Sequence, residues 1–189
     1  MKVRDMTQVA LFAAIMGVLG LLPPITLGFT PVPITMQTIG VMLAGGILGA
    51  KRGGGSLIVF LLIVAAGLPL LSGGRGGPSV FVGPSAGYLF GYIPVAFLIG
   101  YSVERMRKVT FFKMFIVNVV FGIILLYACG VTVQAFVMDL SIIHVLKISL
   151  VFLPGDFLKI VLSSYLVYRI RKSKVIVKQL GLVESKRAA

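Results

Sequence analysis

The stretch from Phe111 to Cys129 reads FFKMFIVNVVFGIILLYAC, and its single charged residue is Lys113. A bilayer hydrocarbon core is about 30 Å thick and is crossed by about 20 helical residues, or about 17 at the least. This stretch is therefore long and apolar enough to be a transmembrane helix. The rest of the chain is similar, since 58% of the 189 residues are hydrophobic and 12% are charged, whereas roughly 25% of a soluble domain is charged. The sequence predicts an all-α integral membrane protein.

Further apolar runs lie on both sides of this stretch, and we expect six transmembrane helices in total. The predicted spans are Met6–Leu22, Met36–Ala50, Leu57–Leu71, Ala86–Val103, Phe111–Cys129 and Phe157–Tyr168. Several are too short to cross alone, so their flanks must extend them or protein must bury irregular backbone beside them. We expect residues 1–172 to form the membrane domain and residues 173–189 a mobile basic cytoplasmic tail. The first run lacks a small-residue cleavage site, so we expect no cleavable signal peptide.

The basic residues cluster at the ends of the apolar runs. The chain has 18 Lys plus Arg against 5 Asp plus Glu, a net charge of +13. With the N-terminus inside, every basic residue falls on the cytoplasmic side except Arg75, Lys147 and Lys159. This is the asymmetry of the positive-inside rule. We therefore expect both termini in the cytoplasm, and we attribute the charge to topology and to contact with anionic lipid rather than to nucleic acid.

The predicted outer connections have unusual compositions. The first, Pro23 to Thr35, holds four prolines and is expected to be stiff and extended. The second runs from Ser72 to Ser85 and is rich in glycine. The third, Gly130 to Gly155, is long enough for a short amphipathic helix around Ser141–Leu153.

Asp156 and Lys159 form the most informative pair of polar residues. They follow Pro154-Gly155 at the start of the last span, and a spacing of three residues places them on one helix face. A charge within the membrane costs at least about 2.5–3.5 kcal/mol on insertion scales. The pair is either a structural ion pair or a polar clamp for a small ligand near the outer face.

The glycine-rich segment Gly73-Gly74-Arg75-Gly76-Gly77 offers a second candidate site. It lacks the Gly-Lys-Ser/Thr ending of a P-loop, and we expect no ATP site and no cofactor in this chain. Its glycines form either a flexible turn or a loop that closes on a small ligand, and Arg75 could hold an anion or meet lipid headgroups. Weaker candidates, each of which could be a packing residue instead, are Gln37, Asn118, Ser79, Ser85 and Tyr88.

Catalytic and metal-binding chemistry is not expected. Cys129 and His144 are the sole cysteine and histidine, so the chain has no Cys/His metal cluster and no internal disulfide. A plausible pair of nucleophile and base is also missing. We therefore expect a protein that is not an enzyme.

Small residues follow one face of the first span, at Ala10, Ala14 and Gly17. Such spacing lets two helix backbones approach closely. On this span an external helical partner and internal packing are equally compatible with the pattern. The pairs Gly45/Gly49 and Gly87/Gly91 are attributed to internal packing.

Taken together, these features resemble the BioY family, the biotin-specific S components of energy-coupling-factor (ECF) vitamin transporters. The segments that carry the resemblance are PVPITMQT (31–38), GLP (67–69), GGRGG (73–77), GPSAGY (83–88) and PGDFLK (154–159). They occur in the family's order and span most of residues 6–172. Family members more often have Thr-Gly where this chain has Ser85-Ala86, and the residue at the position of Arg75 varies among them.

The resemblance implies a six-helix S-component fold in a prokaryotic plasma membrane, with both termini cytoplasmic. It implies a biotin site near the outer face, roofed by the loops after helices 1, 3 and 5, in which Asp156 and Lys159 contact the ligand. It also implies that Ala10 and Ala14 dock a transmembrane T component, to which two ATPase subunits attach. Biotin's ureido ring has N–H donors and a carbonyl, which a carboxylate and an ammonium complement.

Three alternatives remain at this point. One is a self-sufficient secondary vitamin carrier that uses Asp156 as a coupling-ion site, although few intramembrane carboxylates and no inverted repeat support it. Another is an S component for a different small vitamin. A membrane enzyme acting on lipid is the third, and it lacks the catalytic residues noted above.

Overall fold

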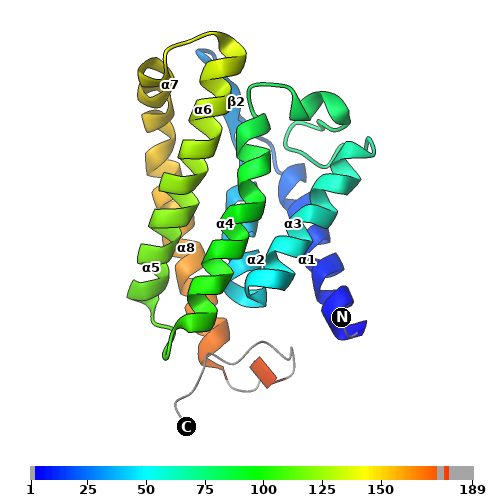
Figure 1. Ribbon diagram of the computed structural model, residues 1–189, viewed down its shortest axis with the longest axis vertical. Coiled ribbons are helices and arrows are strands. Elements are labelled where there is room, and N and C mark those ends of the chain that lie inside the picture. The colour runs from blue at the N-terminus through cyan, green and yellow to red at the C-terminus, as the bar shows by residue number, and fades with distance from the viewer. Residues whose placement is uncertain (1–2, 174–176, 179–189) are drawn as a thin grey trace.

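The computed structural model describes residues 3–173 and 177–178 of the chain. Within them, long helices run side by side, and a hairpin of two short strands lies at one end (Figure 1). The elements are α1 Val3–Leu21, β1 Ile25–Leu27, β2 Thr30–Ile34, α2 Gln37–Leu48, α3 Ala50–Ala65, η1 Pro78–Phe81, α4 Ala86–Arg105, α5 Phe111–Val119, η2 Val120–Leu125, α6 Leu126–Met138, α7 Ile142–Ser149, η3 Leu150–Phe152 and α8 Leu153–Lys172. Most of the predicted tail lies outside the described residues.

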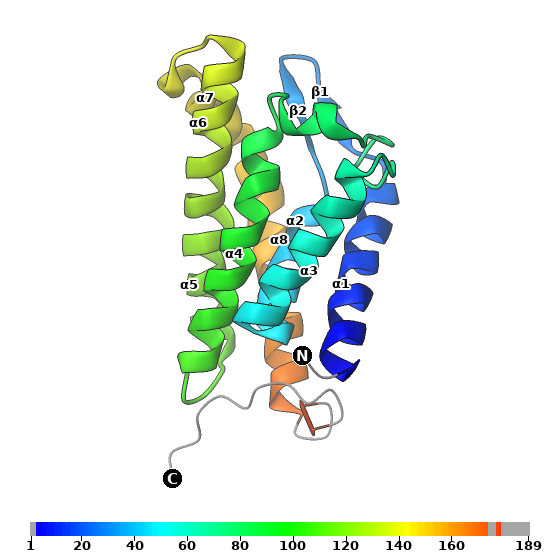
Figure 2. The ribbon, with the colours of Figure 1, turned by 45° about the vertical axis from the view of Figure 1, so that its right-hand side comes forward.

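The two ends of the molecule differ in what they carry. The hairpin and α7 lie at one end, and the start of α1 and the end of α8 lie at the other (Figures 1 and 2). Three helical segments of the described chain are long and apolar enough to cross a membrane: Val3–Leu21, Ala86–Arg105 and Phe111–Met138. The chain is thus a mostly helical membrane protein, as the composition predicts.

The segment from Pro23 to Thr35, predicted to be a stiff and extended loop, contains a β-hairpin. β1 pairs antiparallel with β2, with Leu27 opposite Thr30 and Ile25 opposite Ile34. Prolines fit here because β2 is an edge strand, where a missing N–H costs no ladder hydrogen bond. The expectation of an all-α protein is wrong to this extent.

The boundary between the second and third spans also differs from the prediction. α3 begins at Ala50 rather than Leu57, directly after a one-residue break at Gly49, whose φ is +86°. The glycines 53–55 do not interrupt the helix, because they allow close packing: a Cβ on Gly53 would lie 2.8 Å from the carbonyl oxygen of Ala44. Tertiary packing outweighs the low helix propensity of glycine here.

Side chains from neighbouring helices satisfy the backbone at this break. The Ala50 N–H donates to Oε1 of Glu104 on α4 at 2.9 Å. Arg171 on α8 donates from Nε to the Gly46 carbonyl and from Nη2 to the Ile47 carbonyl, both at 2.8 Å. A carboxylate at a helix N-terminus and a guanidinium at a C-terminus also match the helix dipoles.

The helices at the predicted spans Phe111–Cys129 and Phe157–Tyr168 are longer than predicted. Helix runs from Phe111 through the π-helical segment η2 and then past Cys129 to Met138, so the connection that follows is shorter than Gly130–Gly155. Asp139 ends α6 in the left-handed conformation, with φ +53°. α8 begins at Leu153, because Pro154 occupies the first turn, where its missing N–H is harmless. The expected short amphipathic helix is present as α7, followed by η3.

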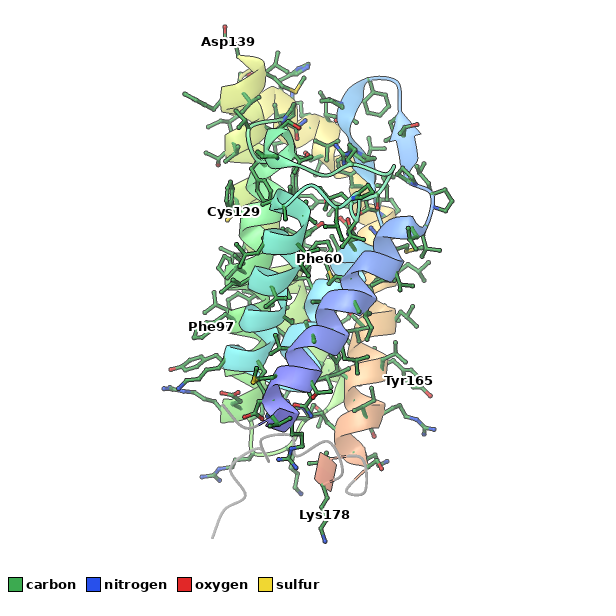
Figure 3. The ribbon with its side chains drawn as sticks, turned by 90° about the vertical axis from the view of Figure 1, so that its right-hand side faces the viewer. Phe60, Phe97, Cys129, Asp139, Tyr165 and Lys178 are labelled. Carbon is green, nitrogen blue, oxygen red and sulfur yellow. The ribbon has the colours of Figure 1, made fainter. Side chains whose placement is uncertain are left out.

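The core lies between the long helices and is closely packed. Phe60, Met16 and Met42 are fully buried, and Figure 3 shows Phe60 inside the bundle, whereas Phe97 and Tyr165 lie at its periphery. Gly45 packs on the Ala96 carbonyl of α4, and Gly87 and Gly91 pack on α6 around Cys129. Internal packing by these α2 and α4 glycines is confirmed.

Candidate functional site

A cavity of about 60 Å3 that is open on one side lies at the hairpin end of the bundle. Residues from β2, α2, α4, α6, α8 and the loop after α3 form its wall. They are Val32, Pro33, Ile34, Thr35, Gln37, Thr38, Leu71, Arg75, Ser85, Tyr88, Leu89, Tyr92, Leu126, Tyr127, Phe152, Asp156 and Lys159.

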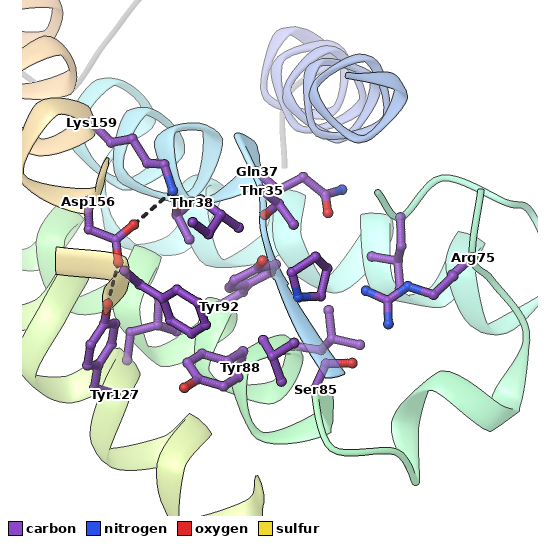
Figure 4. Close-up of a pocket in the computed structure, with 17 residues that line it drawn as sticks. Thr35, Gln37, Thr38, Arg75, Ser85, Tyr88, Tyr92, Tyr127, Asp156 and Lys159 are labelled. Atoms are coloured by element: carbon purple, nitrogen blue, oxygen red, sulfur yellow. Dashed lines mark hydrogen bonds and ion pairs between the residues drawn. The ribbon is translucent and has the colours of Figure 1, made fainter. Parts of the chain in front are cut away.

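An ion pair lies at one end of this cavity (Figure 4). Lys159 Nζ donates to Asp156 Oδ1 at 2.8 Å, and the two residues are 5% and 7% exposed. The Tyr127 hydroxyl donates to the other oxygen, Oδ2, at 2.5 Å. Asp156 occupies the first turn of α8, where a negative charge complements the helix dipole. The group can therefore accept from ligand N–H donors while Lys159 donates to a ligand acceptor.

Three tyrosines build an aromatic wall beside the ion pair. Tyr88 and Tyr127 meet edge to face, with ring centroids 6.3 Å apart, and Tyr92 lies one helical turn along α4 from Tyr88. Tyr88 can pack against α6 because Gly130 has no side chain, and a Cβ there would collide with the Tyr88 ring. The wall suits the apolar part of a ligand.

Gln37, in the wall of the cavity, connects α2 to neighbouring segments. Its Nε2 donates to the Met16 carbonyl of α1 at 3.2 Å and to the Leu70 carbonyl at 3.1 Å. Both amide hydrogens are thus used within the protein. What Gln37 can still offer a ligand is its carbonyl oxygen, an acceptor.

Arg75 reaches the cavity from the glycine-rich loop after α3. Leu71 and Arg75 form an antiparallel bridge, and Gly73 and Gly74 between them have φ of +81° and +69°. Glycine adopts these positive φ angles at little energetic cost. The glycine-rich segment is therefore a defined turn that carries a cation, not a phosphate-binding loop.

The cavity contains some of the predicted site residues and not others. Asp156, Lys159, Arg75, Tyr88, Gln37 and Ser85 line it. Gly76, Gly77 and Ser79 do not: Gly76 packs against the Leu68 carbonyl, the Gly77 N–H donates to the Val64 carbonyl, and Ser79 is exposed on η1.

Asn118 also lies away from the cavity. Its Nδ2 donates to Ser163 Oγ at 3.2 Å and to Ser164 Oγ at 2.9 Å, in a buried contact between α5 and α8. Its geometry is that of a residue that joins two helices.

The small residues of α1 divide into two groups. Ala10 and Ala14 are exposed, so they are free to meet an external helix. Gly17 is buried, and a Cβ on it would touch the Leu70 side chain at 3.5 Å. Gly17 therefore serves internal packing, and the predicted docking face is reduced to the two alanines.

Sequence reasoning missed Tyr127, Tyr92, Thr35 and Thr38 as cavity residues. Tyr127 had a usable signal, because it is a polar group within an otherwise apolar stretch, 119–126 followed by Ala128. Thr35 and Thr38 lie in the segment 31–38 that carries the family resemblance, whereas Tyr92 had no signal that distinguishes it from a packing residue. Among the described residues, no group of three or more His, Cys, Asp or Glu could hold a metal ion.

The fold and the cavity define a helical membrane protein with a pocket, lined by polar and aromatic side chains, at one end of its bundle. The chain belongs to the BioY family, which it matches over residues 1–175.

Comparisons with relatives and with solved structures agree. The chain is 49% identical over 173 residues to the probable biotin transporter BioY of Bacillus subtilis, covering 92% of this chain and 93% of the relative. It is 48% identical over 172 residues to the biotin transporter BioY of Rhizobium etli, covering 88% and 92%. A crystal structure of the S-component for biotin from an ECF-type ABC transporter superposes with a TM-score of 0.87 at 38% identity, covering 90% of this chain and 92% of that chain. These relatives are named as transporters rather than as enzymes.

Proposed function

We propose that this protein is the membrane subunit that captures biotin for uptake. The observation that carries the proposal is the buried ion pair of Asp156 and Lys159, which lines a cavity in a member of the BioY family. A buried ion pair with a cavity beside it is positioned to exchange hydrogen bonds with a polar ligand.

The chemistry of biotin fits the two parts of the cavity. The ureido N–H groups can donate to Asp156, whose oxygens have lone pairs beyond those used by Lys159 and Tyr127, and the ureido carbonyl can accept from Lys159. The thioether ring and the aliphatic chain fit the wall of Leu71, Leu89, Leu126 and the tyrosines.

In the arrangement we propose, the chain crosses a prokaryotic plasma membrane with six helical spans and with both termini in the cytoplasm. The cavity then opens near the outer face. The subunit works within an ATP-driven ECF complex that contains a transmembrane T component and two ATPase subunits. The exposed Ala10 and Ala14 on α1 supply a surface on which the T component can pack.

Equilibrium binding of labelled biotin to the purified protein tests this function. A hydrogen bond to a charged group contributes about 1.5–3 kcal/mol, so Asp156→Asn and Lys159→Met should each weaken biotin binding by roughly 10- to 150-fold. Both variants should remain monodisperse in detergent. Asp139→Asn is a matched control, because Asp139 lies at the end of α6, outside the cavity wall.

Two results would contradict the proposal. Biotin binding of wild-type strength by well-folded Asp156→Asn would make the ion pair structural. Displacement of biotin by a different vitamin at lower concentration would mean that the site serves another substrate.

A further inference from the structure

Arg75 is the third charged side chain in the wall of the cavity. Asp156 and Lys159 are paired at 2.8 Å, so their charges compensate each other. The lining residues therefore carry one excess positive charge, and it resides on Arg75. A neutral ligand would leave this charge without a counterion in a mostly apolar wall, whereas a ligand with one carboxylate would balance it.

The loop after α3 fixes the direction of this side chain. The Leu71 N–H donates to the Arg75 carbonyl at 3.0 Å, and the Arg75 N–H donates to the Leu71 carbonyl at 3.2 Å. The side-chain Nε donates to the Ser72 carbonyl at 3.2 Å. Within the described part of the chain, neither salt bridge involves Arg75, so its terminal nitrogens are available as donors.

The guanidinium and the ion pair come from opposite sides of the cavity (Figure 4). Asp156 and Lys159 project from α8, while Arg75 projects from the loop after α3 toward Thr35 and Tyr92. A ligand that spans the cavity thus meets hydrogen-bonding groups at one end and a lone cation at the other.

We propose that Arg75 binds the carboxylate at the end of the ligand's aliphatic chain and makes the site selective for the free acid over its neutral derivatives. The assignment rests on the proposed function, because biotin is an elongated acid with its polar ring at one end and its carboxylate at the other. A planar guanidinium can donate two parallel hydrogen bonds to a carboxylate, which a neutral amide or ester cannot match.

The alternative anion is a lipid phosphate. Arg75 is only partly exposed and lines the cavity, whereas Lys147 on α7 is fully on the surface at the same end of the molecule. Lys147 therefore serves as the matched control for the loss of one positive charge outside the cavity.

The test measures the binding of biotin and of biotinamide, which lacks the negative charge, to the purified full chain in detergent. Wild-type protein should bind biotin at least about tenfold more tightly than biotinamide. Arg75→Gln should weaken biotin binding by a similar factor and change biotinamide binding by less than about threefold. The biotin affinity of Arg75→Lys should lie between those of wild type and Arg75→Gln, because the ammonium keeps the charge but lacks the planar pair of N–H donors. Lys147→Gln should change neither ligand.

Each other outcome overturns the assignment in a recognisable way. Equal losses for both ligands in Arg75→Gln would make the residue a support for the loop. Unchanged biotin binding by Arg75→Gln would mean that Arg75 contacts lipid headgroups instead of the ligand. If Arg75→Gln does not fold, the comparison of the two ligands on wild-type protein tests the assignment. Wild-type protein that binds biotin and biotinamide equally well would show that the site does not recognise the carboxylate. Wild-type protein that binds neither ligand would refute the proposed function itself, and the role of Arg75 with it.

Discussion

Both carboxylate oxygens of Asp156 have hydrogen-bond partners within the protein. Lys159 occupies Oδ1 and Tyr127 occupies Oδ2. Each oxygen retains a further lone pair, so a ligand can add to this arrangement without breaking it. The arrangement also keeps the carboxylate in one rotamer before the ligand arrives, which reduces the entropy lost on binding.

Tyr127 is therefore predicted to position Asp156. Tyr127→Phe removes the hydrogen bond to Oδ2 and keeps the aromatic wall, so biotin affinity should fall by about three- to thirtyfold, less than the largest loss expected for a hydrogen bond to a charged group. Isothermal titration of the purified variant measures this. Tyr165→Phe, on the exposed face of α8, should bind as wild type does. Unaltered affinity in Tyr127→Phe would show that Lys159 alone holds the carboxylate.

The residue types of the site could be predicted, but not all of their positions. Asp156 and Lys159 stand out because charges are rare in apolar spans. Asn118 has the same signal, yet it joins α5 to α8, because a polar residue in a span can equally satisfy a neighbouring helix. Which of these two roles applies depends on the rotation of each helix, and the sequence does not specify that rotation.

At the level of elements, the break at Gly49 joins several parts of the fold. α2 ends and α3 begins at this break, and side chains from α4 and α8 form hydrogen bonds with the backbone groups that the break leaves unpaired. The position of α8, and with it the position of Asp156, is thus tied to the end of the bundle opposite the cavity.

Arg171 is predicted to stabilise the fold through this contact. Arg171→Met leaves the Gly46 and Ile47 carbonyls without their side-chain donor, and an unsatisfied buried group costs about 1–3 kcal/mol. For a chain of this size, that corresponds to a fall in Tm of roughly 2–12 °C. Thermal unfolding in detergent measures it, with Arg169→Met as the control, because Arg169 is exposed on the same turn. Equal Tm values for the two variants would show that the capping contact adds no stability.

The exposed face of α1 carries a prediction about assembly. Ala10→Trp and Ala14→Trp should leave biotin binding by the isolated subunit unchanged, because both side chains point away from the bundle. They should weaken copurification with the T component, since a large side chain keeps the two helix backbones apart. Leu62→Trp, at an exposed site on α3, is the control. Normal copurification and transport by Ala10→Trp and Ala14→Trp would mean that this face of α1 contacts lipid instead of the T component.

Helix locations could be predicted from apolar runs, but most of their ends could not. The predicted spans that begin at Ala86 and Phe111 start where α4 and α5 start. Thr110 is the N-cap of α5, and its hydroxyl oxygen accepts a hydrogen bond from the backbone N–H of Lys113. The glycines 53–55 and Gly130 resemble helix breakers in sequence. They are helical because other elements pack on them, and that packing is a property of the assembled fold.

At the level of the whole molecule, the distribution of basic residues predicts the orientation in the membrane. In a cysteine-free background, a cysteine at Ser79 should react with an impermeant maleimide on intact cells. A cysteine at Lys108, in the connection between α4 and α5, should react only after permeabilisation. Both positions are exposed, so accessibility alone does not separate them. The opposite labelling pattern would reverse the proposed topology.

The continuous rod of α5, η2 and α6 is longer than the hydrocarbon core of a membrane is thick. It contains 28 residues, and at about 1.5 Å per residue it is about 42 Å long, against a hydrocarbon core of about 30 Å. In the orientation that we propose, Lys113 and the basic connection before it hold one end at the inner interface, so the excess length emerges at the Asp139 end, beside α7 and the hairpin (Figures 2 and 3). In the proposed orientation, the Asp139 end of the protein stands in the headgroup layer, so a charged substrate meets protein there and does not have to cross open hydrocarbon to reach the subunit.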